Sequence, residues 1–349
     1  MDMLSRHGPS WRSTCPSEIG FEIMFFALLL ASTAVPEATT RRFGDWFVAC
    51  DNGRACVAGS LRSDDDDATA VFTLHQAAAA TATPEVAIQL PQGTAMPVQF
   101  VADGRPLILH PRRAEDRLIF SSDDAKRLVA IMHKGDRLTL ADRTGKPLAT
   151  ASLVGAAAVL LAIDDAQHRV GTVAALIRRG PWPTTKIPLA PPLPRIAAIR
   201  ASRREGPALS HARIASLRAE AGCDRVDADA QTYPLDRQQR LLLIACDGGA
   251  YNFDSLAVTV DRAGRATDAP LDQQDADDND DGKLVNVAYN GGILSTFVKG
   301  RGFGDCGHSR SYVWDGRRFV TIEVTRQDEC GGNPDWPVLY RAVPIWRHD

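Results

Sequence analysis

Long apolar runs are nearly absent from this sequence, and that absence excludes a protein built from transmembrane helices. A helix needs about 20 apolar residues to cross a bilayer. The most apolar stretch near the start, residues 23–31, is much shorter than this, and no later segment approaches that length. We therefore expect the mature chain to contain no transmembrane segment.

A strong excess of positive charge is also missing. The sequence has 40 Lys and Arg against 43 Asp and Glu, with a formal net charge of −3. Proteins that bind nucleic acids concentrate Lys and Arg, because phosphate neutralisation dominates their affinity. The balance of charge excludes nucleic acid as the main partner.

Familiar catalytic motifs are absent as well. The sequence has no G-x-S-x-G, no serine followed three residues later by lysine, and no H-E-x-x-H. Nucleophilic hydrolases and zinc proteases with these signatures are thereby disfavoured. A hydrolase whose catalytic residues lie far apart in the sequence and meet only in the fold stays open.

A secretory leader explains the apolar stretch at the start. Arg6 and Arg12 precede residues 23–31, and the small residues Ser32, Thr33 and Ala34 follow them. This order matches a signal peptide over residues 1–34, with cleavage after Ala34 or, as second choice, after Ala38. A buried N-terminal helix is the alternative, but Pro36 disfavours it. We expect a location in the periplasm or outside the cell.

Six cysteines follow the predicted leader, at Cys50, Cys56, Cys223, Cys246, Cys306 and Cys330. An even number in an exported chain indicates disulfides. We pair neighbours in the sequence: Cys50–Cys56, Cys223–Cys246 and Cys306–Cys330. The first pair would close a hairpin around the turn at residues 51–54. The other two close loops of similar size.

Six prolines in residues 181–194 mark the clearest boundary in the chain. They favour an extended linker over residues 181–195. The sequence therefore predicts a first domain at 42–180 and a second at 196–349, each holding its own cysteine pairs. A long loop on the surface of a single domain is the alternative.

The pattern of apolar residues predicts a mostly β protein of the α+β type. Residues 42–180 contain strand-like runs and two helices, at about 122–135 and 156–168, which favours a β-sandwich with one or two helices. Residues 196–349 predict an antiparallel β meander after a short helix that begins at Ser210. We expect residues 284–289 to form one strand. In the last long strand, Val320, Ile322 and Val324 should face the core.

Several motifs resemble known families of secreted bacterial proteins. Residues 43–46 ahead of Cys50, with residues 152–155, resemble the invasion-associated locus B family of proteobacteria. Over residues 42–349 the chain resembles the six-cysteine family called domain of unknown function 1176. That resemblance rests on residues 246–252, 299–307, 312–319 and 330–337. It implies export and disulfides, and it implies no catalytic residue.

One acidic segment resembles half of a calcium loop. Asp277, Asn279 and Asp281 place oxygen ligands at alternate positions ahead of Gly282, but Ala288 stands where an EF-hand has its bidentate glutamate. The segment predicts at most a weak calcium site, with a dissociation constant of about 0.1–1 mM. A solvated acidic loop is the alternative, and we expect no other cofactor.

A glycine-rich loop at residues 299–307 is the other candidate site, with Lys299, Arg301 and Asp305 as possible recognition residues. It matches G-x-G-x-x-G, but a strand-like run follows it where a dinucleotide site needs a helix. We interpret it as a structural or recognition loop beside Cys306. On this interpretation Gly302→Val should lower the melting temperature, and Arg301→Ala should leave stability nearly unchanged.

Together these features favour an exported protein of the cell envelope that acts by binding rather than by catalysis. Its expected partner is another envelope protein or a glycan. The alternatives are a periplasmic hydrolase with dispersed catalytic residues and a structural module stabilised by calcium.

The predicted leader can be tested by fractionation. We expect the mature protein in the periplasm or the medium, with its N-terminus at Val35 or at Thr39, because small residues precede both positions. Mass spectrometry of the purified protein would give the N-terminus. A cytoplasmic protein that keeps residues 1–34 would contradict the prediction.

Overall fold

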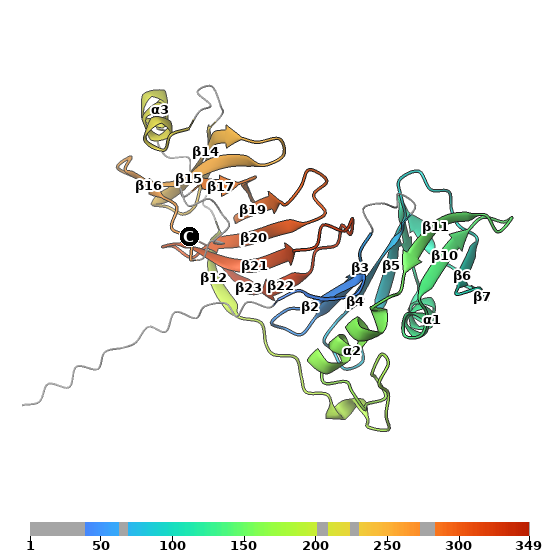
Figure 1. The fold of residues 1–349 in the computed structure, drawn as a ribbon. Helices are drawn as coiled ribbons and strands as arrows, with labels where there is room; N and C mark the ends of the chain where they lie inside the picture. The colour runs from blue at the N-terminus through green and yellow to red at the C-terminus, as the bar shows by residue number, and fades with distance from the viewer. Residues whose placement is uncertain (1–38, 63–68, 201–208, 224–229, 273–282, 349) are drawn as a thin grey trace, which may run out of the picture. The chain divides into compact units, whose positions relative to one another are not determined.

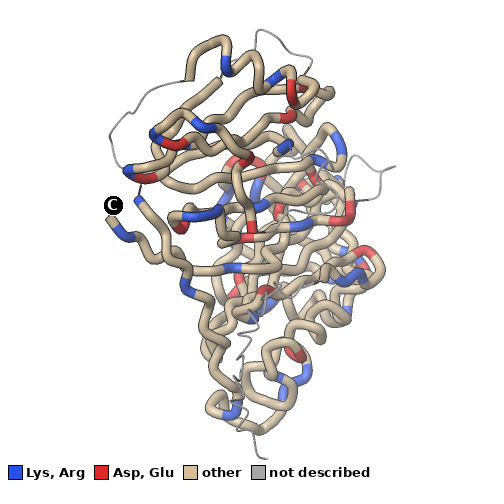
Figure 2. Tube along the Cα trace, turned by 90° about the vertical axis from the view of Figure 1, so that its left-hand side faces the viewer, with Lys and Arg blue, Asp and Glu red and all other residues tan. Residues whose placement is uncertain are grey.

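The computed structural model describes residues 39–62, 69–200, 209–223, 230–272 and 283–348 (Figure 1). Strands dominate this part of the chain, which contains three α-helices, as the sequence predicts. Acidic and basic residues are interspersed over the trace (Figure 2).

The first half of the chain, up to residue 180, forms two antiparallel sheets. One has the order β1 (Arg41–Phe43), β2 (Trp46–Cys50), β3 (Cys56–Ser60), β4 (Val71–Gln76), β5 (Glu85–Gln89), β9 (Arg117–Ile119), β8 (Arg112–Ala114). The other has the order β11 (Pro147–Ser152), β10 (Arg137–Ala141), β6 (Gln99–Ala102), β7 (Arg105–Leu107). Residues from both sheets share one hydrophobic core. Trp46 is fully buried in it, and its Nε1 donates to the carbonyl of Ser152 at 3.0 Å, so it links the two sheets.

Two helices complete this core. Helix α1 (Ser122–Met132) begins where the Ser121 hydroxyl accepts from the backbone amide of Asp124, and it buries one face of its cylinder. Helix α2 (Ala156–Ala166) packs on β2. Gly155 precedes α2 with φ +100°, and a Cβ there would lie 1.8 Å from the carbonyl oxygen of Phe43. Only glycine can therefore start α2 this close to β1.

The second half contains two larger sheets and a parallel pair. The first sheet joins β13 (Ala230–Pro234), β14 (Gln239–Gly248), β15 (Phe253–Asp261) and β16 (Ala266–Asp268), with β17 (Lys283–Val285) also on β15. The second has the order β18 (Ala288–Asn290), β19 (Ile293–Lys299), β20 (Gly307–Trp314), β21 (Phe319–Gln327), β22 (Val338–Arg341). Helix α3 (His211–Glu220) is capped by Ser210, as predicted.

The parallel pair departs from a simple meander. Strand β12 (Arg195–Arg200) comes directly after the proline-rich segment and pairs with β23 (Val343–His348) near the end of the chain. The proline-rich segment contains a short 3₁₀ turn, Thr184–Lys186, and Ile187 is buried.

One local expectation was wrong, and another was incomplete, because Ile322 and Val324 are buried as expected but the opposite face of their strand is buried as well. Residues 284–289 form two strands, because Asn286 has φ +44° and breaks the run between β17 and β18, which pair with different neighbours. The other concerns β21, whose two faces are both buried: Phe319 packs with Trp314, whereas Ile322 packs with Val313. Side-chain alternation therefore does not separate a core face from a solvent face in this strand.

A segment of the second half lies against the first-half sheet. The fully buried Asn333 amide donates to the carbonyls of Ser60 and Phe72, at 3.0 and 2.8 Å. Asp335 accepts hydrogen bonds from Arg117 and from the Thr73 hydroxyl. The division into two domains around residues 181–195 stays a prediction, and these contacts show how the halves meet.

Among the residues that the structure describes, no helix has the length and apolar character needed to cross a membrane.

The Asp335 contacts predict a dependence of stability on pH. Burial acts to raise the pKa of Asp335, but the hydrogen bonds from Arg117 and Thr73 outweigh it, so the pKa is lowered. A lowered folded-state pKa contributes stability above the unfolded-state value of about 3.9, and that stability is lost as the pH falls through the folded-state pKa. We expect Asp335→Asn to cost about 1.5–3 kcal/mol at pH 7.

The cost should shrink as the pH falls below about 4, which melting curves of both proteins from neutral to acidic pH would show. Asp123→Asn is the control, because the Asp123 side chain is 84% exposed. An equal difference in stability between Asp335→Asn and the parent protein at all these pH values would contradict the assignment.

Candidate functional site

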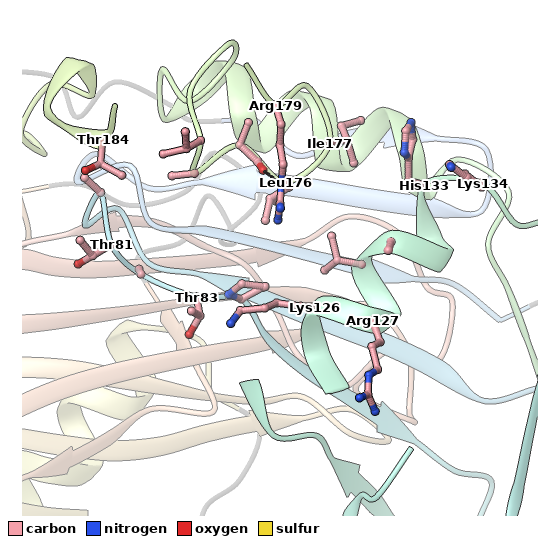
Figure 3. Close-up of a pocket in the computed structure, with 18 residues that line it drawn as sticks. Thr81, Thr83, Lys126, Arg127, His133, Lys134, Leu176, Ile177, Arg179 and Thr184 are labelled. Carbon is pink, nitrogen blue, oxygen red and sulfur yellow. Dashed lines mark hydrogen bonds between the residues drawn. The ribbon is translucent and has the colours of Figure 1, made fainter. Parts of the chain in front are cut away.

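A groove in the first half is the strongest candidate site (Figure 3). Its volume is about 760 Å³, and its walls are α1, residues 80–84 and residues 173–184. Sites for small molecules usually measure about 300–1,000 Å³ and are lined mainly by apolar side chains. This groove has the size of such a site.

Small apolar side chains form most of the surface of the groove: Ala80, Ala82, Pro84, Val129, Ala130, Val173, Ala174, Ala175, Leu176 and Ile177. The hydroxyl groups are those of Thr81, Thr83 and Thr184. Five basic residues complete the lining: Lys126, Arg127, His133, Lys134 and Arg179. No carboxylate or thiol belongs to this described set of lining residues, so the polar character of the groove is cationic.

The basic residues differ in how far they are already paired. Arg127 contacts the Asp124 carboxylate at 3.1 Å and donates to the carbonyl of Ile108. Lys126 lies 3.4 Å from the exposed carboxylate of Asp123. Arg179 donates through Nε to the carbonyl of Ala175 at 3.0 Å. In the described part of the chain, no carboxylate lies within ion-pair distance of His133, Lys134 or Arg179.

One fully buried guanidinium holds two walls of the groove. Arg169 donates to the carbonyl oxygens of Ala77, Ala79 and Ala80, at 3.2, 2.7 and 3.4 Å. It also donates to the carbonyl oxygen of Ala174, in the other wall, at 3.4 Å. These carbonyls lie outside strands and helices. Those of Ala77 and Ala79 also accept from Gln76 Nε2 and from the Ala82 amide, at 3.3 and 2.9 Å, whereas in the described residues those of Ala80 and Ala174 depend on Arg169. Arg169 therefore fixes both loops at once.

A buried carboxylate supports the same wall. Asp164, at 0% exposure near the end of α2, accepts from the backbone amides of Leu176 and Ile177, at 2.7 and 3.0 Å. Burial lowers the pKa of the Arg169 guanidinium, and the negative charge of Asp164 opposes this effect. The guanidinium stays charged, because arginine is not deprotonated in proteins.

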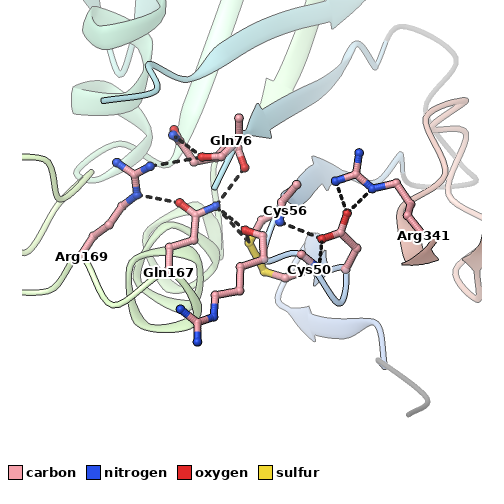
Figure 4. The surroundings of a disulfide bond; sticks show 11 residues. Cys50, Cys56, Gln76, Gln167, Arg169 and Arg341 are labelled. Atoms are coloured by element: carbon pink, nitrogen blue, oxygen red, sulfur yellow. Dashed lines mark hydrogen bonds and ion pairs between the residues drawn. A yellow bond between two sulfur atoms is a disulfide. The ribbon is translucent and has the colours of Figure 1, made fainter. Parts of the chain in front are cut away.

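Gln167 connects this network to a disulfide (Figure 4). Its Oε1 accepts from Nε of Arg169 at 2.6 Å. Its Nε2 donates to the carbonyls of Arg54 and Gln76, at 2.7 and 2.9 Å, and lies 3.6 Å from Sγ of Cys56. The hairpin closed by Cys50–Cys56 is therefore joined through Gln167 to the walls of the groove.

The structure pairs all six predicted cysteines: Cys50–Cys56, Cys223–Cys246 and Cys306–Cys330, with Cα–Cα distances of 4.0, 4.7 and 4.7 Å. This is the predicted pairing of neighbours in the sequence. A cystine has no thiolate, so Cys306 does not provide a nucleophile in this state.

The predicted recognition loop is held internally. Arg301 donates to Asp305 from Nε and Nη2, at 2.8 and 2.6 Å, and from Nη2 to the carbonyl of Cys330 at 2.6 Å. The hydrogen bonds from Arg301 lower the pKa of Asp305, while burial opposes this shift. The Lys299 stem lies beside Gly304.

These contacts change two expectations about the loop. Arg301→Ala would remove both bonds to the buried Asp305, so a nearly neutral effect on stability does not fit the geometry. A Cβ at Gly302 would meet only the Tyr251 ring, at 3.6 Å, an ordinary contact distance. This contact does not explain the expected loss of stability in Gly302→Val. The demanding glycine is Gly307, with φ +136° and a Cβ position 1.9 Å from the Val298 carbonyl oxygen.

The predicted calcium ligands Asp277, Asn279 and Asp281 lie outside the described residues. Within the part that is described, no three or more His, Cys, Asp or Glu side chains come together as a metal site would require.

Sequence reasoning missed the groove and the buried network. Lys126, Lys134 and Arg179 look like ordinary surface residues in the sequence, and Gln167 and Arg169 sit in an unremarkable stretch after a helix. The one available signal was position: a long polar side chain directly after an apolar helix, beside an alanine-rich segment, can turn inward to bind loop carbonyls.

Removing the buried guanidinium should loosen the groove. We expect Arg169→Met to lower the free energy of unfolding by about 3–5 kcal/mol, because it breaks a buried charged network and, among the described residues, leaves the carbonyls of Ala80 and Ala174 without a donor. Hydrogen exchange should rise at residues 77–82 and 174–178. Arg178→Met is the matched control, because Arg178 is exposed and its change should stay within about 0.5 kcal/mol. Equal melting of the two variants would contradict the role of Arg169.

The chain can be compared with known proteins on this basis. It is similar to the "Uncharacterized protein YpfG" of Escherichia coli (strain K12), with 30% identity over 92% of this chain and 98% of the relative. No solved structure matches the chain. The resemblance of the first half to locus B proteins stays a prediction. A family model described as "Protein of unknown function (DUF1176)" matches residues 40–343. The resemblance seen in the sequence is thereby confirmed, and the chain belongs to the DUF1176 family.

Proposed function

We propose that this protein is an exported, periplasmic binding protein whose ligand site is the groove between α1 and residues 173–184. One observation carries the proposal: a groove of about 760 Å³ has two walls fixed by a single, fully buried arginine. A binding site held in shape before the ligand arrives loses less conformational entropy on binding.

The location rests on the disulfides and the leader. Three disulfides indicate an oxidising compartment outside the cytoplasm. The pattern of residues 1–34 matches a signal peptide, so the periplasm is the compartment that we propose.

The chemistry of the groove favours binding over hydrolysis. A hydrolytic site needs a nucleophile or an activated water beside a general base, often with a second titratable group to orient the base. The lining supplies one histidine and three threonines. Figure 3 shows His133 at the opposite end of the groove from Thr81 and Thr184. A hydrolase that uses another surface stays the alternative.

A second recognition surface is the loop that carries Lys299, Arg301 and Asp305. Phe303 at its tip is 91% exposed, and the Arg301 guanidinium lies 5.8 Å from the centre of its ring. An exposed aromatic side chain beside an arginine is typical of contacts with protein partners. We propose an envelope protein as the partner of this loop. A weak calcium site at Asp277, Asn279 and Asp281 stays a hypothesis.

Photo-cross-linking in living cells tests the groove. A benzophenone amino acid replaces Val173, which lines the groove and is 53% exposed, or Val98, a matched control outside the groove that is 49% exposed. We expect an adduct from position 173 and none from position 98 after irradiation. The mass of the adduct distinguishes a small molecule or glycan from a protein. Adducts at neither position, or equally at both, would contradict a ligand site in the groove.

A further inference from the structure

We infer that the ligand of the groove is a small amphiphile with a single acyl chain and an anionic headgroup. This inference rests on the proposed binding function and goes beyond it by naming the chemical class of the ligand. Three features of the groove carry it: the sign of its charge, the apolar character of its surface, and the exposed apolar edge formed by Val173 and Trp182.

The charge of the groove selects an anion. Three carboxylates bond to described residues of the lining: those of Asp123, Asp124 and Asp164. Asp124 already accepts bonds from Arg127 and from the backbone of His110, and Asp164 is buried beneath residues 176–178. These acids are therefore committed to α1 or to the wall, apart from the exposed Asp123.

Not all of the cations have another evident role. His133 and Lys134 follow the C-terminus of α1, where positive charge also favours the helix dipole. Arg127 already forms an ion pair with Asp124. Arg179 has no such explanation: it is exposed, and among the described residues its side chain forms only a bond from Nε to a carbonyl on its own loop. Figure 3 shows its side chain extending from residues 173–184 toward the centre of the groove.

The surface between the cations is apolar. Ala130 on α1 is exposed, and Leu176 and Ile177 in the other wall are half-buried; all three line the groove. An inorganic anion would leave this surface in water, whereas an acyl chain would cover it and gain about 25 cal/mol for each Å² buried. A purely polar ligand, such as a phosphorylated sugar, fits the cations but not this surface.

The apolar surface continues past the mouth of the groove. Val173 is 53% exposed and Trp182 58% exposed, and the Val173 amide donates to the carbonyl of Trp182 at 2.8 Å. The Trp182 ring packs on Gly171, where a Cβ would lie 3.2 Å from ring carbon atoms. The edge is thus held in place although its side chains are open to solvent. An exposed apolar edge that is held in place would contact the part of an acyl tail that extends out of the groove.

Calorimetry with the mature protein, residues 35–349, tests the class of ligand. The probe is dodecanoate below its micelle concentration. Dodecyltrimethylammonium has the same chain length with the opposite charge, and acetate has the same headgroup with almost no chain. We expect dodecanoate to bind and the other two to bind at least about tenfold more weakly, a difference of about 1.4 kcal/mol.

Variants locate the headgroup. Lys134→Met with Arg179→Met removes two charges and keeps apolar stems, so dodecanoate should bind about fivefold more weakly. Arg105→Met on β7 is the control, since Arg105 is an exposed cation outside the lining and its change should leave binding unaltered. Melting curves establish that all of these variants fold.

Different outcomes of these experiments would overturn different parts of the proposal. Equal affinity for the cationic analogue, or unchanged binding by the double variant, would overturn the anionic headgroup. Binding of acetate as strong as that of dodecanoate would overturn the acyl chain. A protein adduct at position 173 without dodecanoate binding would overturn the ligand class and leave the binding function standing. No dodecanoate binding together with no adduct at position 173 would overturn both.

Discussion

The buried guanidinium of Arg169 is the interaction on which the candidate site depends. Charged groups are rarely fully buried, because the loss of water is costly unless every donor finds a partner. Arg169 meets this condition with Gln167 and with carbonyls from two separate loops. The residues that supply these carbonyls lie outside the β-strands, so hydrogen bonds between strands do not satisfy them. Without the guanidinium, the two walls would lose the contacts that hold them at a fixed separation, and the groove would lose its shape.

Short-range order in this protein could be predicted from the sequence. Helices α1 and α2 follow from apolar spacing, and α3 follows from Ser210 as its cap. The Cys50–Cys56 bridge follows from a six-residue separation across a turn. These features depend on residues that are close in the sequence, so local propensity is enough to define them. The mostly β class follows for the same reason.

Features that depend on distant partners could not be predicted in this way. Gln167 bonds to Gln76 across 91 positions, and Asn333 bonds to Ser60 across 273. No periodic pattern in the sequence predicts such pairs, because in each one a single polar side chain forms a hydrogen bond with a single backbone group. The parallel pairing of β12 with β23 has the same origin, as does the burial of both faces of β21. The groove is formed by distant segments, and its cations look like surface residues until the fold brings them together.

Two alanine-rich segments, residues 77–80 and 174–175, contact Arg169. In the sequence, residues 77–80 and 174–175 look uninformative, since alanine suits many environments. In the structure the carbonyls of Ala77, Ala79, Ala80 and Ala174 accept from one guanidinium. The short side chains of Ala80, Ala174 and Ala175 line the groove. Larger side chains there would fill the space that Val129 and Ile177 now border. Small residues and one long buried cation therefore act together: the cation fixes the backbone of the walls, and the alanines keep the space between them open.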